Sequence, residues 1–93
     1  MSTELYFEWD EEKEVANIKK HGIDFKSASF VFLDMNRIEI FDEAHSELED
    51  RYITIGVVEE VLTVVYTERK KSIRIISARP ATKKEIERYY YGD

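Results

Sequence analysis

The chain has 93 residues, a net charge of −6 and no cysteine, and it is 43% hydrophobic and 37% charged. A chain of this length supports a single modest core, so we expect one domain over residues 1–93. The lack of cysteine excludes disulfides, cysteine-based metal sites and cysteine nucleophiles. The N-terminus lacks the basic start and apolar run of a signal peptide, and no segment is apolar enough to cross a bilayer. We therefore expect a protein of the cytoplasm without a membrane partner.

The charge is divided unevenly along the chain. Residues 1–60 hold 6 Lys and Arg against 16 Asp and Glu, a balance of −10, whereas residues 61–93 hold 8 against 4, a balance of +4. Nucleic-acid binding is driven largely by lysine and arginine, which displace counterions from the phosphates. If the chain binds a polyanion, we expect the last third to do so.

An N-terminal helical hairpin is expected. Residues 10–22 predict a helix, because Asp10 can cap its start and Gly22 can take the left-handed conformation after its end. Residues 23–34 predict a second, shorter helix that buries one face in the core. That face is formed by Phe25, Ala28, Phe32 and Ser29.

Two other N-terminal features give weaker signals. The aromatic segment 5–9 is typical of a short edge strand. In the helix over residues 10–22, Val15 and Ile18 form only a thin apolar stripe, with Ala16 beside them. This helix is therefore expected to lie on the surface of the domain.

From residue 37 onward the pattern predicts strands. Runs rich in β-branched and aromatic residues alternate with short charged turns. The expected strands span residues 37–42, 51–58, 61–69 and 72–79. They predict an antiparallel meander of four strands, followed by a helix over residues 81–93 that starts with a capping box of Thr82 and Glu85. Helices, then strands, then a helix predict an α+β fold.

The arginines near the end of the predicted sheet are candidates for a phosphate site. Because side chains alternate along a strand, Arg74 and Arg79 lie on opposite faces unless a bulge intervenes. Arginines at neighbouring strand ends, such as Arg69 and Arg79, can converge on a phosphate. Ion pairing with some of the chain's 20 carboxylates is the more ordinary use of any single arginine. Arg74, deepest in its apolar run, suits a structural ion pair, and the alternative is that it binds RNA.

The remaining polar candidates are of several kinds. Lys83 and Lys84 stand in the first turn of the last helix, where free N–H groups favour an anion and lysine opposes the dipole unless an anion is bound. His21 suits the C-terminal end of its helix electrostatically, and His45 lies in an acidic connection, so no metal site is expected. At least one tyrosine of residues 89–91 is expected to be exposed, available for stacking on a base or contacting a partner, although packing of the C-terminal end is the more ordinary use of such residues. The chain has no nucleophile elbow, phosphate-binding glycine loop or dinucleotide fingerprint, so no cofactor is expected.

Five stretches of the sequence together resemble a known family. They are FEWDEEKEVANIKKHGIDF, SASFVFLD, EDRYITIG, LTVVYTER and RIISARPATKKEIERYY, and they cover nearly the whole chain. In order and spacing they resemble the BrnT family of bacterial type II toxins. The resemblance implies a RelE-like fold and a metal-independent endoribonuclease that stalls translation. It also implies a BrnA-type antitoxin with a ribbon-helix-helix region, in a heterotetramer that represses its own operon, so that DNA is contacted only through the antitoxin.

The resemblance also implies roles for individual residues. The basic active-site arginines of the family would match Arg69 and Arg79. Their neighbours in that site would be Lys20, His21 and Tyr66. Pro80 departs from the family pattern and pushes Arg79 toward extended geometry. The reaction would be attack of an RNA 2′-hydroxyl on its own phosphate, which needs charge stabilisation and proton transfer.

A function of a different class fits the same residues. A non-catalytic interaction module would dock an acidic partner at its basic end, or a basic partner at its acidic end. Acidic charge and exposed tyrosines serve both hypotheses, and the resemblance favours the ribonuclease toxin.

Overall fold

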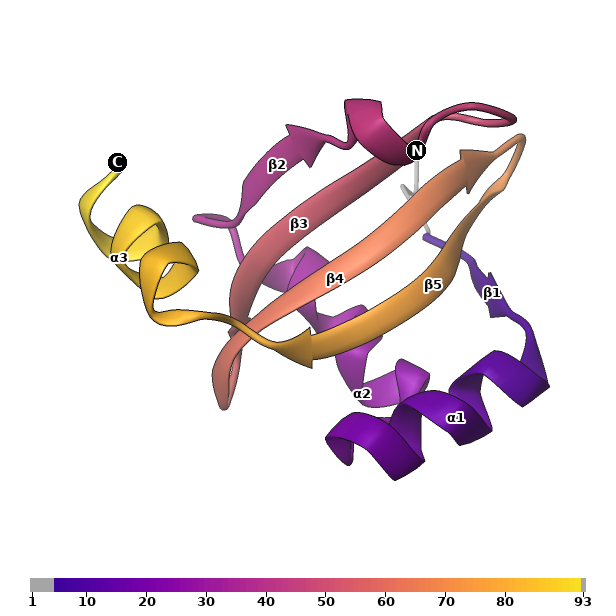
Figure 1. Ribbon diagram of the computed structural model, residues 1–93, viewed down its shortest axis with the longest axis horizontal. Coiled ribbons are helices and arrows are strands. Elements are labelled where there is room, and N and C mark those ends of the chain that lie inside the picture. The colour runs from indigo at the N-terminus through magenta and orange to yellow at the C-terminus, as the bar shows by residue number, and fades with distance from the viewer. Residues whose placement is uncertain (1–4, 93) are drawn as a thin grey trace.

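The computed structural model describes residues 5–92, which form one five-stranded sheet with helices packed against it (Figure 1). In chain order the elements are β1 (Phe7–Trp9), α1 (Glu11–His21), α2 (Phe25–Ser29), the 3₁₀ turn η1 (Phe30–Leu33), β2 (Ile38–Phe41), the 3₁₀ turn η2 (Glu43–His45), β3 (Arg51–Val58), β4 (Glu60–Arg69), β5 (Ser72–Pro80) and α3 (Lys83–Tyr91). No helix in this part of the chain is long and apolar enough to span a membrane.

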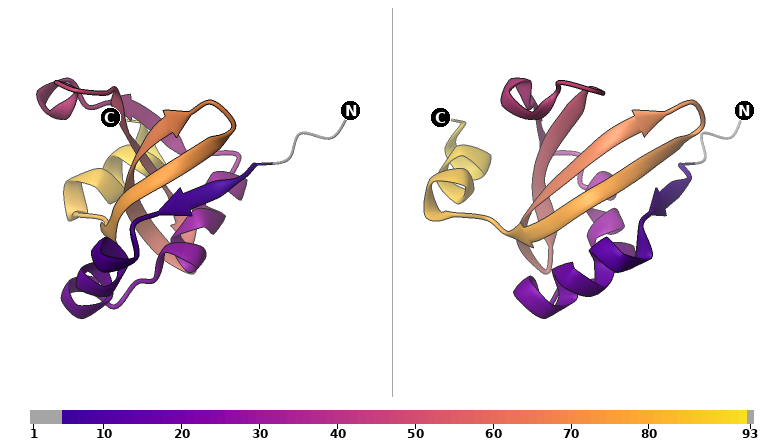
Figure 2. Two further views of the ribbon diagram at one scale, coloured as in Figure 1. Left: turned by 90° about the vertical axis from the view of Figure 1, so that its right-hand side faces the viewer. Right: turned by 45° about the vertical axis from the view of Figure 1, so that its right-hand side comes forward.

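The strands lie in the order β1-β5-β4-β3-β2. Strands β2 to β5 form the antiparallel meander that the sequence predicts, and β1 adds a parallel strand along β5 (Figure 2). The prediction of a sheet with only four antiparallel strands is therefore wrong, although segment 5–9 does supply an edge strand. Phe7 and Trp9 pack on the core, and Glu8 between them faces the other way, which is the alternation of a half-buried strand.

The core lies between one face of the sheet and the segment formed by α2 and η1. Phe25, Ala28 and Phe32 are buried there, as predicted. They pack against sheet residues Leu62, Val64, Tyr66, Ile75 and Ala78. We call this face of the sheet the inner face and the opposite one the outer face.

The predicted helical hairpin is wrong in detail. The second helix, α2, has only five residues and passes directly into η1. Both α1 and α2 pack against β5, so the sheet organises the two helices. The predicted caps of α1 are confirmed: the Asp10 side chain accepts from N–H groups of the first turn, and Gly22 follows the helix with a φ of 71°.

A polar residue, rather than the apolar stripe, attaches α1 to the sheet. Val15 and Ile18 are 56% and 43% exposed, whereas Asn17 is only 7% exposed. The Asn17 amide nitrogen donates to the main-chain oxygens of Ile23 (2.9 Å) and Ala78 (2.8 Å). Its side-chain oxygen accepts from the N–H of Ala78 at 3.1 Å. Asn17 thus satisfies both main-chain polar groups of a buried strand residue.

Replacing Asn17 with alanine should lower the free energy of unfolding by about 2–4 kcal/mol, because buried main-chain groups of Ala78 and Ile23 lose their partner. Urea denaturation followed by circular dichroism measures this change. Val15→Ala, on the exposed side of the same helix, is the matched control and should change stability by less than about 0.5 kcal/mol. Equal losses in the two variants would contradict the role given to Asn17.

Candidate active site

A β-bulge in β5 decides which arginines share a face. The register between β4 and β5 shifts between Val65 and Tyr66, so that Ile76 of β5 faces no residue of β4. One extra residue reverses the alternation of the side chains that follow it. Arg79 therefore lies on the outer face together with Arg74, which is the alternative that the sequence left open.

The outer face has cations at both ends and an apolar middle. Across β5, β4 and β3 its successive rows are Arg79, Thr63 and Ile55; Ser77, Val65 and Ile53; and Arg74, Thr67 and Arg51. Arg69 follows at the end of β4, beside Ser72. At about 3.4 Å per residue, the first and third rows are about 14 Å apart along the strands. The three predicted arginines thus lie on a single surface.

Each of these three arginines is paired with a carboxylate. The pairs are Arg69 with Glu49 (3.3 Å), Arg74 with Glu8 (2.6 Å) and Arg79 with Glu85 (2.8 Å). The side chains of Arg69 and Glu49 are 43% and 42% exposed, and ion pairs so exposed contribute little stability. The hydrogen bonds from Ser72 and Arg74 hold the pKa of Glu8 below its ordinary value. The exposed Arg69–Glu49 pair is weak enough to open and admit a phosphate in place of the carboxylate.

Glu85 is the centre of the most connected polar cluster. Its two oxygens accept from the two terminal nitrogens of Arg79, at 2.8 and 3.0 Å. The same carboxylate accepts from the Thr63 hydroxyl (2.9 Å) and from the N–H of Thr82 (2.8 Å), which completes the predicted capping box of α3. The bond from Arg79 is the main reason that the pKa of Glu85 falls to about 2. Glu85 is therefore ionised at neutral pH and ties α3 to β4 and β5.

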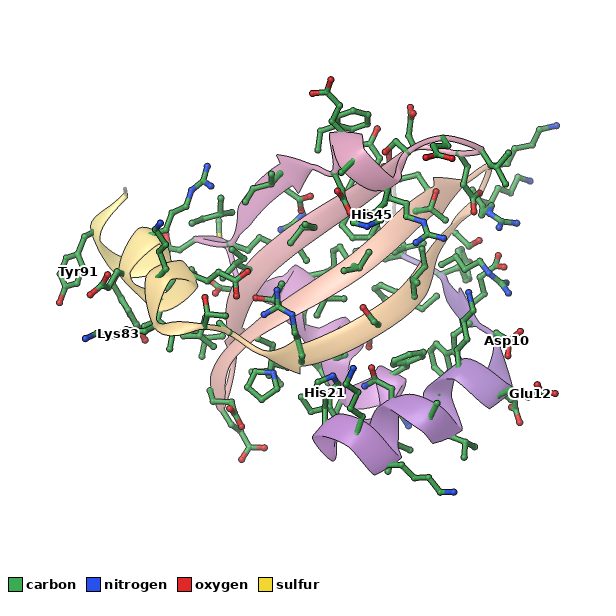
Figure 3. All side chains as sticks on the ribbon, in the orientation of Figure 1. Asp10, Glu12, His21, His45, Lys83 and Tyr91 are labelled. Carbon is green, nitrogen blue, oxygen red and sulfur yellow. The ribbon has the colours of Figure 1, made fainter. Side chains whose placement is uncertain are left out.

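A cleft of about 570 Å³ lies between α3 and the outer face. The strands contribute three isoleucines, Ile40, Ile53 and Ile55, and α3 with its flanks contributes Thr82, Lys84, Glu85, Arg88 and Gly92. Among residues 5–92, neither Lys84 nor Arg88 has a side-chain ion pair or hydrogen bond. Lys83, by contrast, points away from the sheet (Figure 3). The cleft thus combines an apolar strand side with unpaired positive charge on the helix side.

Of the other predicted catalytic residues, Tyr66 faces away from the outer face, and Lys20 and His21 lie at the C-terminal end of α1. Tyr66 lies on the inner face, only 6% exposed, and its hydroxyl donates to Glu39. Burial and this bond raise the pKa of Tyr66. Lys20 and His21 are the last two residues of α1, where Figure 3 labels His21, and within the described part of the chain no hydrogen bond or ion pair joins either residue to the arginines. The roles of Tyr66, Lys20 and His21 stay predictions, without support from this geometry.

His45 lies in η2, where its Nδ1 is 3.0 Å from a carboxylate oxygen of Asp42. Over residues 5–92 the structure contains no group of three or more His, Asp or Glu side chains that could hold a metal ion.

Three residues on or over the outer face are not site candidates from the sequence alone. The sequence predicts Glu85 only as part of a helix cap, although a cap of this kind also places a carboxylate beside the preceding strand. Arg88 lies one helical turn after Glu85, a spacing that puts both on one side of α3 and could have identified it. Arg51 joins the third row only through the register of β3 against β4, which no local pattern reveals.

The sequence and the fold both match known proteins. The model of the family described as "Ribonuclease toxin, BrnT, of type II toxin-antitoxin system" matches residues 9–85. The chain belongs to this family of ribonuclease toxins. The crystal structure of the ribonuclease toxin BrnT from Brucella abortus is 26% identical in sequence, with a TM-score of 0.68, over 86% of this chain and all of that one. No curated protein matches the sequence. The BrnT family match includes Arg69, Arg74 and Arg79.

The Glu85 carboxylate should make the stability of the fold depend on acidic pH. Because its pKa is lowered from 4.5 to about 2, its contribution is fully present above about pH 4.5 and is lost as the pH falls through about 2. A pKa shift of this size corresponds to a contribution of about 3 kcal/mol to the free energy of unfolding. Because Arg79 is partly exposed, solvent screening reduces this contribution to about 1–2 kcal/mol.

Urea denaturation of wild type and Glu85→Gln near neutral pH and near pH 2.5 measures this contribution. The stability difference between the two proteins should shrink at the lower pH. Glu87→Gln is the control, because Glu87 is exposed on the same helix. Its free energy of unfolding should match that of wild type at both pH values. A Glu85→Gln deficit that is independent of pH would contradict the assignment.

Proposed function

We propose that this BrnT-family protein is a metal-independent endoribonuclease that cleaves RNA on the outer face. The observation that carries the proposal is the common face of Arg69, Arg74 and Arg79, which the bulge at Ile76 produces. The 2′-oxygen of a ribose attacks the adjacent phosphorus, the bond to the 5′-oxygen breaks, and a proton passes from the 2′-hydroxyl to the leaving oxygen. Negative charge grows on the phosphate oxygens during this step, and guanidinium groups stabilise it.

The arginines divide this work by position. Arg79 is held by Glu85 beside the cleft and is the proposed contact to the cleaved phosphate. A guanidinium carries more N–H donors than Glu85 engages, so Arg79 can bind a phosphate oxygen while Glu85 still orients it. Arg74 and Arg69, about 14 Å further along the strands, would hold a neighbouring part of the RNA backbone. Lys84 adds a cation at the start of α3.

Glu85 is proposed as a positioning residue rather than a base. With a pKa of about 2 it is a weak proton acceptor, and its oxygens already accept from Arg79, Thr63 and Thr82. The proposal assigns no step to Lys20, His21 or Tyr66. Proton transfer by solvent water or by the RNA itself is compatible with this set of side chains.

A family of type II toxins implies an antitoxin partner. We propose that the partner is a BrnA-type ribbon-helix-helix protein, that toxin and antitoxin form a heterotetramer in the cytoplasm, and that the complex reaches DNA through the antitoxin alone. The acidic balance of −10 over residues 1–60 supports a basic partner segment, and Glu11 and Glu12 are exposed in the first turn of α1. The proposed fold relationship is to RelE-like ribonucleases.

Arg79→Ala should lower RNA cleavage by about 100-fold or more, because the developing charge on the phosphate loses its donor. Purified wild type and variant are incubated with a defined RNA in EDTA, and circular dichroism confirms that both are folded. Metal-independent cleavage by wild type and its loss in the folded variant are the expected results. Equal cleavage by both would contradict the assigned site.

Arg37→Ala is the matched control for this experiment. Arg37 is also paired with a glutamate, Glu39 at 2.9 Å, but it lies over the Phe32 ring on the side of the inner face. This variant should cleave RNA at a rate close to wild type. No cleavage by any of the three proteins, together with tight partner binding, would favour a non-catalytic interaction module.

The antitoxin proposal makes a separate prediction. The toxin co-expressed with a small ribbon-helix-helix protein encoded beside it should purify as one complex whose mass, by light scattering, equals two copies of each chain. The complex should not cleave RNA, and removal of the antitoxin by proteolysis should restore cleavage. A stable one-to-one complex would contradict the heterotetramer.

A further inference from the structure

The cleft beside α3 has a composition that the cleavage step does not explain. That step needs cations and a way to move a proton, whereas the strand side of the cleft is formed by Ile40, Ile53 and Ile55. Ile40 and Ile53 are only partly covered there, whereas Ile55 is buried at the base of the cleft, and partly exposed isoleucines are unfavourable unless something covers them. At about 570 Å³, the cleft falls in the size range of small-molecule sites.

In the described part of the chain, Arg88 is one of two unpaired cations in the cleft, with Lys84. It lines the cleft from α3, and among residues 5–92 its guanidinium has no ion pair or hydrogen bond. The carboxylate one helical turn away, Glu85, already accepts from Arg79, Thr63 and Thr82. Arg88 therefore presents its charge and its planar donors to whatever occupies the cleft.

The two sides of the cleft favour a nucleobase over a protein segment. An amphipathic helix or strand docks best between apolar walls. Here the strand side is apolar, but every residue on the helix side is polar, charged or glycine. A nucleobase has an apolar face and a polar edge, and in single-stranded RNA both are available for contact. Lys84, also unpaired in the cleft, complements the negative charge of the attached phosphate.

We propose that the cleft binds one guanine base of the substrate RNA, which lies against the isoleucines while Arg88 donates two hydrogen bonds to its edge. Arginine makes this bidentate contact with O6 and N7 of guanine more often than any other specific base contact. The base is held next to the cleaved phosphate, because Glu85 both lines the cleft and binds Arg79. This inference rests on the proposed function and adds to it a preference of the ribonuclease for guanine next to the cleaved phosphate.

The base-reading residue of the subsite lies beyond the matched family region. The match to the BrnT family ends at residue 85, and Arg88 follows it. Family membership therefore does not assign the guanine contact.

Methyl NMR tests the subsite without requiring catalysis. The protein is labelled at isoleucine δ1-methyl groups and titrated with the 5′-monophosphates of guanosine, adenosine, cytidine and uridine. The methyl signals of Ile40, Ile53 and Ile55, which line the cleft, should shift, whereas the signal of Ile75, which packs in the core on the inner face, should not. The guanosine nucleotide should bind about 10-fold more tightly than the other three.

Three variants separate base recognition from charge and from folding. Arg88→Ala should abolish the preference for guanosine, and Arg88→Lys, which keeps the charge but loses the planar fork, should bind all four nucleotides alike. Lys83→Ala is the matched control, since Lys83 lies on the same helix and points away from the sheet. It should leave the preference unchanged. The dispersion of the isoleucine methyl signals reports whether each variant is folded.

Cleavage of RNAs that differ at one guanine completes the test. Wild type should cut the guanine-containing RNA about 10-fold faster, and Arg88→Lys should cut both at similar rates. Cleavage that depends on Arg79 but shows no guanine preference would overturn the subsite and leave the proposed function standing. Guanosine-selective methyl shifts in a protein that cleaves no RNA would support the subsite and overturn the proposed function. Methyl shifts caused by the antitoxin, with none from any nucleotide, would identify a protein-docking cleft and overturn the inference.

Discussion

One unpaired residue, Ile76, is the constraint on which the functional face depends. With strict alternation along β5, the arginine at position 79 would face the same side as Ile75, in the core against α2. An unpaired charge in such a place is strongly unfavourable. With the extra residue, Ile75 and Ala78 both face inward, at 1% and 0% exposure, and Arg74 and Arg79 both face outward. The bulge thus reconciles a filled core with a cationic surface on the same strand.

The second requirement is that α3 holds a fixed position over the outer face. Glu85 fastens the start of the helix to β4 and β5. Nearer the other end, the Tyr89 hydroxyl donates to Asp34, and the same carboxylate accepts from the N–H of Val57 at 2.8 Å. The bond to Asp34 raises the pKa of Tyr89 to about 12, so the phenol stays a hydrogen-bond donor even at alkaline pH. Two polar anchors therefore set the width of the cleft.

Sequence patterns within a few residues predict the helices and strands of this fold. The arrangement of these elements depends on strand pairings between residues distant in sequence. The caps at Asp10 and Thr82 follow from side chains within a few residues, and the alternation in the four C-terminal strands is equally local. The partner of β1 is β5, where Phe7 lies beside Ile73, and no pattern within either strand specifies that pairing.

The same division holds for the candidate site. The cluster of arginines near the end of the sheet was evident from the sequence, whereas their common face depends on a shift of one residue between two strands. The family resemblance predicts Tyr66 as a neighbour of the active-site arginines. However, the alternation of side chains along β4 places Tyr66 on the inner face, in the core. The cleft itself was not predicted, because it exists only where α3 returns across strands that precede it in the chain.

The Asn17 amide has a consequence for how the molecule meets other chains. β1 pairs with residues 73–75 of β5 and leaves the rest of that strand edge uncovered by a strand. At Ala78 the Asn17 side chain supplies one donor and one acceptor, the same pair that another strand would offer. An open strand edge is a template on which further chains can add and aggregate. A single side chain on α1 therefore closes that template at Ala78, on the β5 edge that β1 leaves open.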